Sequence, residues 1–353
     1  MGRGDEESPV TSIALFNNKG GDGKTTLAYH LAHMYQRLGK RVLAVDLDPQ
    51  SNLTSAFLDE DDLAFLWDET DLPFGPRQEA MFTLLSPETK TIAQAVQPIV
   101  EGTGDVELIE PAQVVEGLWL LPGDLELSRF EDELSQAWGN TLAGNAKAVR
   151  ATTAFYRFIQ NARRVVDPDV VLIDVGPNLG AINRAALLSS DTVLMPLAAD
   201  LFSLRGLRNL GPTLAEWRRK WQGVVVHQAP KDMVLPSGNM SPLGYVIMQP
   251  GFRLDRPVGA YKRWLDRIPM VYERFVLEES GIEGGGDHEI ATIRQYRSLM
   301  PLAHDARKPM FDLRTAGGAM GSMQGLVEKC RSEFRDLTYA IDGRLAALGE
   351  RLR

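Results

Sequence analysis

The sequence contains little sulfur chemistry, because Cys330 is the one cysteine among its 353 residues. A single thiol cannot form a disulfide within the chain, and it cannot supply the paired ligands of a Cys-x-x-Cys site or of an iron–sulfur cluster. Long apolar runs are also missing, and none approaches the roughly 18 to 20 residues of a membrane-spanning helix. The segment Met1–Pro9 is polar and acidic, unlike a signal peptide. We therefore expect a cytoplasmic protein.

Positive charge is scarce overall, since the formal net charge is −9. The acidic excess is concentrated in residues 51–135, which hold nineteen Asp and Glu against three Lys and Arg, a net of −16. Residues 201–353, in contrast, carry a net charge of +6. Polyanion binding depends on a basic surface, which the overall charge alone would exclude. The basic part of the chain leaves a nucleic-acid partner open.

Size and composition are those of an ordinary globular protein, with 44% hydrophobic and 24% charged residues. The length suits one large α/β domain with insertions. We expect a single domain over residues 1–353, with a flexible N-terminus at 1–10. Within it we expect an acidic region with an insertion at 51–135 and a variable helical insertion at 250–290.

Apolar strands alternate with helical patterns along most of the chain. The expected strands are Thr11–Asn17, Arg41–Asp46, Leu118–Leu121, Val170–Asp174, Thr192–Leu197 and Tyr245–Met248. The first expected helix begins near Lys24 and stops near Gly39. The others span Asn145–Val166, Asn183–Ser190, Ser203–Trp221, Ala260–Leu277 and Gln324–Leu348. Residues 51–117 are broken by prolines and predict inserted helices and loops, and Gly281–Gly286 predicts a flexible loop. The alternation predicts an α/β fold with a doubly wound, mostly parallel sheet flanked by helices.

The strongest motif is the glycine-rich segment Lys19–Thr26, which follows the first strand. It matches G-x-x-x-x-G-K-[ST] when the first glycine is relaxed to Asn18. In this pattern backbone N–H groups wrap phosphate oxygens, Lys24 reaches the terminal phosphates, and Thr25 offers a hydroxyl to magnesium. A glycine-rich turn without a ligand is the alternative, and the strand before and the helix after it favour the P-loop.

Three carboxylates follow expected strands. Asp46 and Asp48 stand at alternate positions of an extended segment, which suits a magnesium shell and an oriented water. Asp174 ends an apolar strand and can hold magnesium through water across the crevice. Acidic loop residues without a ligand are the alternative. Their position one βαβ step after a P-loop favours phosphate chemistry.

With its second lysine, Lys19, the loop resembles the deviant Walker A motif K-G-G-x-G-K-[ST]-[ST] of the ParA/MinD family of P-loop ATPases. Asp46–Asn52 is similar to that family's D-x-D-P-Q-[GS]-N element, and Val170–Asn178 is similar to its Walker B segment. Ser190–Leu207 follows its S-D-x-[VL] segment closely. The resemblance covers nearly the whole chain except residues 55–115 and about 250–290.

The resemblance implies a homodimer that sandwiches two ATP molecules with Mg²⁺, in which Lys19 touches the phosphates across the interface. It implies that Asp48 positions the attacking water and that Asp46 supports the metal region. It assigns catalytic roles to Lys19, Lys24 and Asp48, and metal roles to Thr25, Asp46 and Asp174. The implied nucleotide-binding residues are Lys19, Gly20, Gly21, Asp22, Gly23, Lys24, Thr25, Thr26, Arg294 and Pro301.

Two departures from the family pattern stand out. The segment from Arg294 to Pro309 is similar to the part that packs around adenine, but Ile293 replaces the usual proline before the arginine. The variable loop position is Asp22, a carboxylate that would cost about 1 kcal/mol or more beside a triphosphate. Asp22 either points to a partner or weakens nucleotide binding, and both readings remain open.

The cysteine count narrows the possible roles within this superfamily. One thiol excludes a nitrogenase-type reductase and an arsenite pump, and the tail after Tyr339 has no tyrosines, unlike the tyrosine-kinase relatives. A ParA-type partition ATPase remains, which is released from DNA when a protein partner stimulates its slow hydrolysis, and which would be nucleoid-associated. Its candidate DNA surface lies on two expected helices and comprises Arg205, Arg208, Arg218, Arg219, Lys220, Lys262, Arg263 and Arg267. The alternative interpretation of these residues is a solvated face without a ligand. The tryptophans among them, Trp217, Trp221 and Trp264, have the spacing of core residues.

Two other roles are weighed against partition. A MinD-like positioning ATPase would bind membrane through its C-terminus, but residues 345–353 lack the Trp or Phe of an interfacial anchor and predict an ordinary closing helix. A nucleotide-switched adaptor would recruit a protein partner through the acidic region 51–135, for example within a defence or mobile-element system. We expect the ParA-type role and an ATPase that is weak without its partner.

Overall fold

The computed structural model describes residues 11–21, 23–67, 85–86, 88–249, 258–278, 287–314 and 321–352. The expected flexible N-terminus at 1–10, the loop at Gly281–Gly286 and the side chain of Asp22 lie outside this part of the chain. Within the described ranges, no helix combines the length and the apolar character needed to cross a membrane.

An eight-stranded sheet forms the centre of the molecule, with the strand order β3-β4-β2-β5-β1-β6-β7-β8. All neighbours run parallel except β3 and β4, which form an antiparallel edge. The strands are β1 (Thr11–Leu15), β2 (Val42–Asp46), β3 (Ala112–Val115), β4 (Leu118–Leu121), β5 (Val170–Asp174), β6 (Thr192–Leu197), β7 (Ser241–Gln249) and β8 (Glu289–Arg294). The expected doubly wound, mostly parallel sheet is confirmed.

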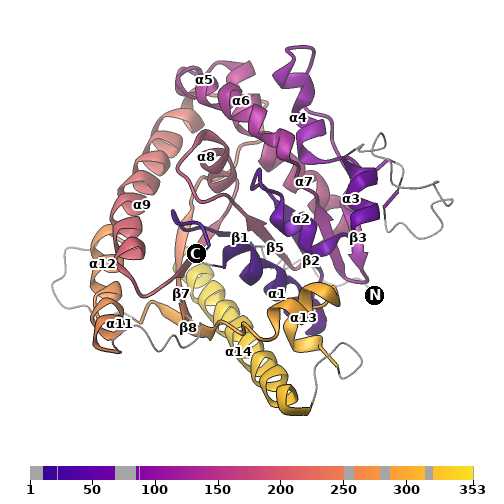
Figure 1. Ribbon diagram of the computed structural model, residues 1–353. Coiled ribbons are helices and arrows are strands. Elements are labelled where there is room, and N and C mark those ends of the chain that lie inside the picture. Colours follow the sequence, from indigo (N-terminus) through magenta and orange to yellow (C-terminus); the bar gives the residue numbers. More distant parts are fainter. Residues whose placement is uncertain are drawn as a thin grey trace, which may run out of the picture.

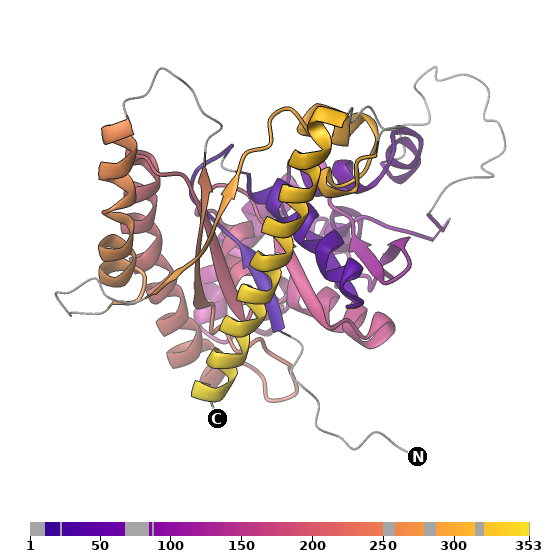
Figure 2. The same ribbon diagram turned by 90° about the horizontal axis from the view of Figure 1, so that it is seen from below.

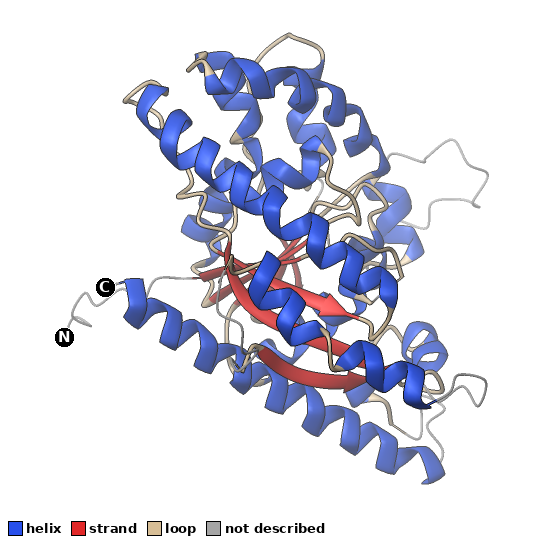
Figure 3. Ribbon diagram, turned by 90° about the vertical axis from the view of Figure 1, so that its left-hand side faces the viewer, coloured by secondary structure: helices blue, strands red, loops and turns tan. Residues whose placement is uncertain are grey.

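Helices cover both faces of the sheet (Figures 1 and 3). The helices of the N-terminal half are α1 (Lys24–Arg37), α2 (Asn52–Phe57), α3 (Glu60–Leu66), α4 (Ile92–Val100), η1 (Leu125–Arg129), α5 (Phe130–Leu142), α6 (Ala146–Thr152) and α7 (Ala154–Val166). Those of the C-terminal half are α8 (Ala181–Leu188), α9 (Leu201–Lys220), η2 (Trp221–Val225), α10 (Val226–Gln228), α11 (Val258–Leu265), α12 (Ile268–Phe275), α13 (Met300–Asp305), η3 (Met310–Asp312) and α14 (Gly321–Leu352). Helix α14 runs beside α1 and closes that face (Figure 2).

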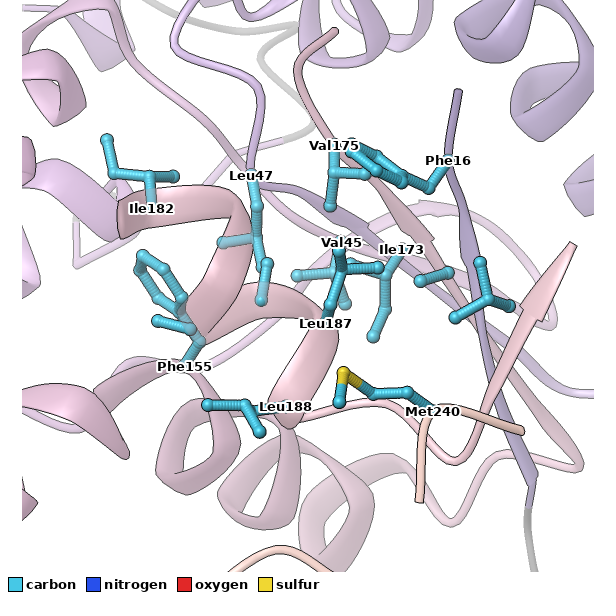
Figure 4. Packing of buried hydrophobic residues seen from close by; sticks show 14 of the residues in the cluster. Phe16, Val45, Leu47, Phe155, Ile173, Val175, Ile182, Leu187, Leu188 and Met240 are labelled. Carbon is cyan, nitrogen blue, oxygen red and sulfur yellow. The ribbon is translucent and has the colours of Figure 1, made fainter. Parts of the chain in front are cut away.

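The core consists of two clusters, one on each face of the sheet. Along β1, Ile13 and Leu15 join the cluster that includes α1 and α14, whereas Ala14 and the following Phe16 join the cluster that includes α7, α8 and α9. Figure 4 shows part of the second cluster, where strand side chains lie beside those of α8. Because a parallel sheet is buried on both faces, its strands read as continuous apolar runs, which is why β5 was recognisable in the sequence.

Several elements differ from the expectation. The helix expected over Asn145–Val166 is broken into α6 and α7 at Thr153, whose hydroxyl donates to the Val149 carbonyl over 2.8 Å and competes with the helical ladder. The helix expected over Ala260–Leu277 is broken into α11 and α12, since Pro269 near the start of α12 cannot continue a preceding helix. Strands β3 and β8 were not expected from the sequence; both are edge strands, and β3 has only four residues.

Candidate nucleotide site

The strand order brings the sequence motifs to one edge of the sheet. Neighbouring strands β2, β5, β1 and β6 run parallel, so the loops that follow them meet at their common carboxyl edge. The loop after β1 holds the glycine-rich motif, the loops after β2 and β5 hold the three aspartates, and the loop after β6 leads into α9. This is the edge at which doubly wound sheets bind ligands.

The glycine-rich loop turns into α1 through two left-handed residues, Gly21 at φ 80° and Gly23 at φ 81°. A side chain at Gly23 would be strained, and its Cβ would lie 3.2 Å from Met248 Cε. Lys24 begins α1 and is only 6% exposed, and its Nζ donates to the Lys19 carbonyl over 2.9 Å. The first N–H groups of α1 lack acceptors within the helix, so the loop and helix together form an anion-binding end.

Lys19 lies at the rim of the site and is tied to the next loop. Its Nζ is 2.8 Å from Asp200 Oδ2. Asp200 caps α9 by accepting a hydrogen bond from the Ser203 backbone N–H over 2.9 Å. Burial opposes ionisation of Asp200, but the hydrogen bonds from Lys19 and Ser203 outweigh it and keep its pKa below the usual value. The signature lysine is thus held in an ion pair beside the first turn of α9.

Asp46 and Asp174 end adjacent strands and are partners in the register of β2 and β5. Asp46 is fully buried, and its Oδ2 accepts hydrogen bonds from the Thr54 backbone N–H over 2.8 Å and from the Thr54 hydroxyl over 2.7 Å. Burial raises the pKa of Asp46 to about 6 despite these bonds. Thr54 in turn accepts from the Gly123 N–H over 2.8 Å. Asp46 therefore fixes the start of α2 and the turn after β4.

Asp174 has a different environment. It is fully buried, and within the described part of the chain neither carboxylate oxygen accepts a hydrogen bond of good geometry, although the Thr25 hydroxyl lies near enough to favour its ionised form. Burial and the charge of Asp46 raise its pKa well above the usual value. Buried carboxylates normally have partners, so this orphaned group fits a cation or an ordered water.

The described side chains do not by themselves form a chelating cluster of three His, Cys, Asp or Glu residues. A magnesium ion here would draw most of its ligands from phosphate oxygens and water, which is how this ion usually binds. The residues that fit it are Thr25, at the end of the P-loop, and Asp174.

Asp48 lies on the cavity side of the same edge. It is 7% exposed, its backbone N–H lies 3.3 Å from Asp46 Oδ1, and its Oδ1 accepts from the Gln50 N–H over 3.0 Å. A Cβ at Gly176, in the turn after Asp174, would lie 3.4 Å from Asp48 Oδ1. The Asp48 carboxylate therefore sits between the loops that follow β2 and β5.

A cavity of about 860 Å³ opens at this edge, within the size range of small-molecule sites. One end is the P-loop and the first turns of α1, and the other end is formed by residues between Ile293 and Met310. Of the predicted site residues, those lining the cavity are Gly20, Gly21, Gly23, Lys24, Thr25, Thr26, Asp48 and Arg294. Lys19, Asp46, Asp174 and Pro301 are not among the lining residues; Pro301 is exposed at the start of α13, whereas Asp46 and Asp174 are fully buried.

Several residues that shape the site were not found by sequence reasoning. The Asn183 amide donates to the carbonyls of Gly176 and Asn178 over 2.9 and 2.7 Å and fixes the turn after β5. The Glu131 carboxylate accepts from the first N–H groups of α8, 2.6 Å from Ala181 N and 2.8 Å from Ile182 N. The Glu131 contacts span 50 and 51 residues, whereas the Asn183 contacts span 7 and 5 residues, and no motif in the sequence marks either residue.

The candidate DNA residues fall into two groups. Arg218 is half-buried and donates to the Asn239 and Met240 carbonyls over 2.6 and 2.9 Å, so it holds the loop before β7. Lys220 pairs with Glu216 over 2.6 Å. The exposed members on α9, α11 and the turn before α12 are Arg205, Arg208, Arg219, Lys262, Arg263 and Arg267. Trp217 and Trp221 are buried as expected, whereas Trp264 is half-buried.

The sequence matches a known protein family and characterised relatives. A family model described as an AAA domain (AAA_31) matches residues 10–224, more than half of the chain. The chromosome-partitioning ATPase Soj of Thermus thermophilus is 34% identical over 209 residues, which cover 59% of this chain and 63% of that protein. The match thus spans less than two thirds of that relative's length.

Solved structures share the fold. A protein from Corynebacterium diphtheriae has a TM-score of 0.66 and 22% identity, covering 95% of this chain and 99% of its own. The Cyanothece McdA–ATP complex has a TM-score of 0.57 and 16% identity, covering 94% and 96%. Together with the motifs at the carboxyl edge, these matches place the chain in the AAA domain family AAA_31, among the P-loop ATPases of the ParA/MinD type.

Proposed function

We propose that the chain is a dimerising ATPase switch of the ParA type, which binds and slowly hydrolyses ATP with Mg²⁺ to control DNA association and the partner-driven partition or positioning of a cargo. The observation that carries the proposal is Asp174, a buried carboxylate without a good hydrogen bond in the described part of the chain, near the hydroxyl of the P-loop residue Thr25. Such a group is costly unless a bound cation or water compensates it.

The residues divide the work in the following way. The P-loop N–H groups and Lys24 bind the phosphates, and Thr25 and Asp174 hold the magnesium ion, the latter through water. The ion, when bound, neutralises charge that develops on the phosphate oxygens. Asp48, accessible from the cavity, orients the attacking water. Asp46 is saturated by Thr54 and acts by holding the loop in place.

Dimerisation is proposed from the rim of the site. Lys19 would exchange its Asp200 partner for the phosphates of a second subunit's nucleotide. The cations of α9 and α11 would form the DNA surface, with Arg205, Arg208 and Arg219 on the first and Lys262 and Arg263 on the second. DNA association would follow the dimer, since two subunits present twice as many of these cations as one and affinity grows with the number of phosphates neutralised.

Sedimentation with plasmid DNA tests the proposal. Wild type, Lys24→Ala, Lys19→Ala and Asp48→Ala are compared with ATP, with ADP and without nucleotide, and anionic liposomes replace DNA in a parallel series. We expect ATP-dependent DNA association in wild type and Asp48→Ala, and its loss in Lys24→Ala and Lys19→Ala. Basal phosphate release is expected to be slow in wild type and absent in Asp48→Ala.

Other results would redirect the proposal. ATP binding without association to DNA or liposomes would favour the adaptor role of residues 51–135, and ATP-dependent liposome binding would favour membrane positioning. If neither ATP binding nor turnover is detected under any condition, the ATPase proposal is wrong.

A further inference from the structure

His30 joins the two ends of the nucleotide cavity. It lies in α1, is 4% exposed and contributes to the cavity lining. Its Nδ1 is 2.7 Å from the Thr26 carbonyl oxygen, in the first turn of α1. Its Nε2 is 3.0 Å from the backbone nitrogen of Met310, 280 residues away in the sequence. One side chain thus connects the phosphate end of the cavity with the wall formed by residues 293–310.

The two contacts define the state of the ring. The Met310 N–H can only donate, so Nε2 of His30 must accept, and the proton must stand on Nδ1, where it donates to the Thr26 carbonyl. Burial lowers the pKa of His30 to about 4, against a smaller opposing effect of the Thr26 hydrogen bond. The ring is therefore neutral at physiological pH and keeps both hydrogen bonds.

Aromatic neighbours fix the plane of the ring. Phe334 of α14 stacks on it with a centroid distance of 5.0 Å and an interplanar angle of 28°. Phe311 and Tyr29 meet it edge-on at 5.7 and 5.3 Å. These buried contacts leave the imidazole little freedom to swing away from Met310.

Met310 is one of the points where the far wall of the cavity is attached to the rest of the fold. It opens η3, and the first N–H groups of a helix have no acceptor within it, so His30 supplies the acceptor that this buried N–H needs. The same wall is tied to the end of α2 by Arg307, whose Nη1 donates to the Leu58 carbonyl over 2.6 Å. His30 ties this wall directly to α1 by a side-chain hydrogen bond, and Arg37 of α1 pairs with Asp312 at the other end of η3.

We propose that His30 is a positioning residue for nucleotide binding, which holds the wall at Met310 at a fixed distance from the phosphate-binding turn of α1. A nucleoside triphosphate must contact both ends at once, so a wall that is already in place lowers the ordering cost of binding. The inference rests on the proposed ATP binding. It predicts that His30 sets the affinity for ATP and leaves the rate of hydrolysis at saturating ATP unchanged.

Three variants of the full-length chain separate the hydrogen bonds from the packing. His30→Phe keeps a ring against Phe334 but cannot accept from Met310. His30→Gln places an amide oxygen near the position of Nε2 and can retain that bond. Tyr35→Phe is the matched control on the same helix, because it removes a hydrogen bond to Asp342 of α14 over 2.9 Å without touching the cavity lining.

The dissociation constant of ATP is measured by titration with a fluorescent ATP analogue, together with the melting temperature and the ATPase rate at saturating ATP. We expect about tenfold weaker binding for His30→Phe, the scale of one buried donor left unpaired. Binding by His30→Gln should stay within about threefold of wild type. Tyr35→Phe should bind ATP normally at a lower melting temperature.

Unchanged ATP affinity in a folded His30→Phe would overturn the positioning role, as would an equal loss of affinity in Tyr35→Phe. If His30→Phe does not fold, His30→Gln is compared with His30→Asn, whose shorter amide reaches Thr26 but not Met310, and equal affinities would overturn the role. Absence of ATP binding in wild type would instead reject the proposed function, which separates the two failures.

Discussion

At the scale of single residues, three aspartates at one sheet edge differ because their neighbours differ. Asp46 has its Oδ2 saturated by Thr54 and serves the fold. Asp48 reaches the cavity and keeps part of its surface accessible. Asp174 is buried without such bonds in the described chain and carries an electrostatic cost. Asp46 and Asp48 are the same residue type in the same sequence element, so the sequence alone does not distinguish them. Their hydrogen-bond partners show which carboxylate is structural and which is open to a ligand.

The cost at Asp174 leads to a prediction about stability without nucleotide. Its pKa is raised on folding, so the folded state resists ionisation, and the penalty is present above the folded pKa and fades as the pH falls toward the unfolded value near 3.8. Asp174→Asn removes the charge and should stabilise the nucleotide-free protein at pH 8 by about 1 kcal/mol or more. Melting temperatures of both proteins from pH 8 to pH 5 check this, and the difference should shrink as the pH falls.

The matched control is Asp46→Asn, which also removes a charge with a raised pKa but disturbs two hydrogen bonds from Thr54, so its melting temperature at pH 8 should stay below that of Asp174→Asn. In the same measurements, Mg²⁺ with ATP should raise the melting temperature of wild type much more than that of Asp174→Asn. A destabilised Asp174→Asn at pH 8 would contradict the assignment of a stored cost to this carboxylate.

At the scale of elements, the close packing of α9 and α12 shapes the candidate DNA surface. Gly211 of α9 lies against the backbone of α12, and a Cβ there would be 1.8 Å from the Phe275 carbonyl oxygen and 2.9 Å from the Cα of Val276. The exposed candidate arginines of α9 include Arg208, which lies over the Phe275 ring of α12 at 5.6 Å, and Arg267 directly precedes α12. The spacing of the cations therefore depends on this glycine.

Gly211→Ala should separate α9 from α12 and destabilise the protein by about 1 to 3 kcal/mol, the usual cost of overpacking. We expect weaker ATP-dependent DNA association with an unchanged affinity for ATP, because the nucleotide cavity does not include these helices. Chemical denaturation and DNA sedimentation measure the two effects. Gly223→Ala is the control, since a Cβ there meets no atom within 4 Å. Equal stability of both variants would contradict a tight contact at Gly211.

The elements that the sequence predicted correctly are those whose cause is local. Val170–Ile173 is a run of buried apolar residues, as a strand covered on both faces must be, and Gly21 and Gly23 mark the turn into α1 by their left-handed backbone. The break at Thr153 depends on one hydrogen bond from its hydroxyl, and the break before Pro269 depends on the missing N–H of the proline. The helical periodicity of the surrounding residues does not reveal either break. Most residues of β8 are half-buried or exposed, so their sequence does not form the apolar run that marks a fully buried strand.

The same distinction applies to the site. Lys24, Thr25 and Asp48 were predicted because the phosphate motifs fix their spacing, and they line the cavity. The contact between His30 and Met310 spans 280 residues, and that between Glu131 and the start of α8 spans 50. Such contacts are created by the topology of the chain, so no pattern in a single sequence marks them.

At the scale of the whole molecule, opposite charges gather on different parts of the fold. Part of the acidic region has a local cause, because Glu60–Asp62 and Glu131–Glu133 lie in the first turns of α3 and α5, where negative charge complements the helix dipole. The exposed candidate DNA residues lie on α9, α11 and the turn before α12, on the left in Figure 1, whereas α3 lies on the right and α5 lies at the upper left, above α9. The overall charge of −9 thus does not describe the surface that would meet DNA.

The rim of the site also carries an exposed apolar patch, which leads to a prediction about dimer formation. Leu201 and Phe202 directly follow Asp200, the partner of Lys19, and Phe202 is 67% exposed. If Lys19 reaches a second subunit's phosphates, this apolar patch must face that subunit, where its burial would stabilise the dimer.

Phe202→Asn removes most of that apolar surface without adding charge beside Asp200. In the Asp48→Ala background, where ATP is not consumed, we expect Phe202→Asn to weaken the ATP-dependent dimer by about tenfold, the size of effect that loss of a buried aromatic contact commonly has. ATP affinity should be unchanged. Sedimentation velocity over a concentration series gives the dimer dissociation constant. Val226→Asn, at an exposed apolar residue that begins α10 beyond the C-terminal end of α9, is the control and should dimerise normally. A dimer constant unaffected by Phe202→Asn would place the contact between subunits elsewhere.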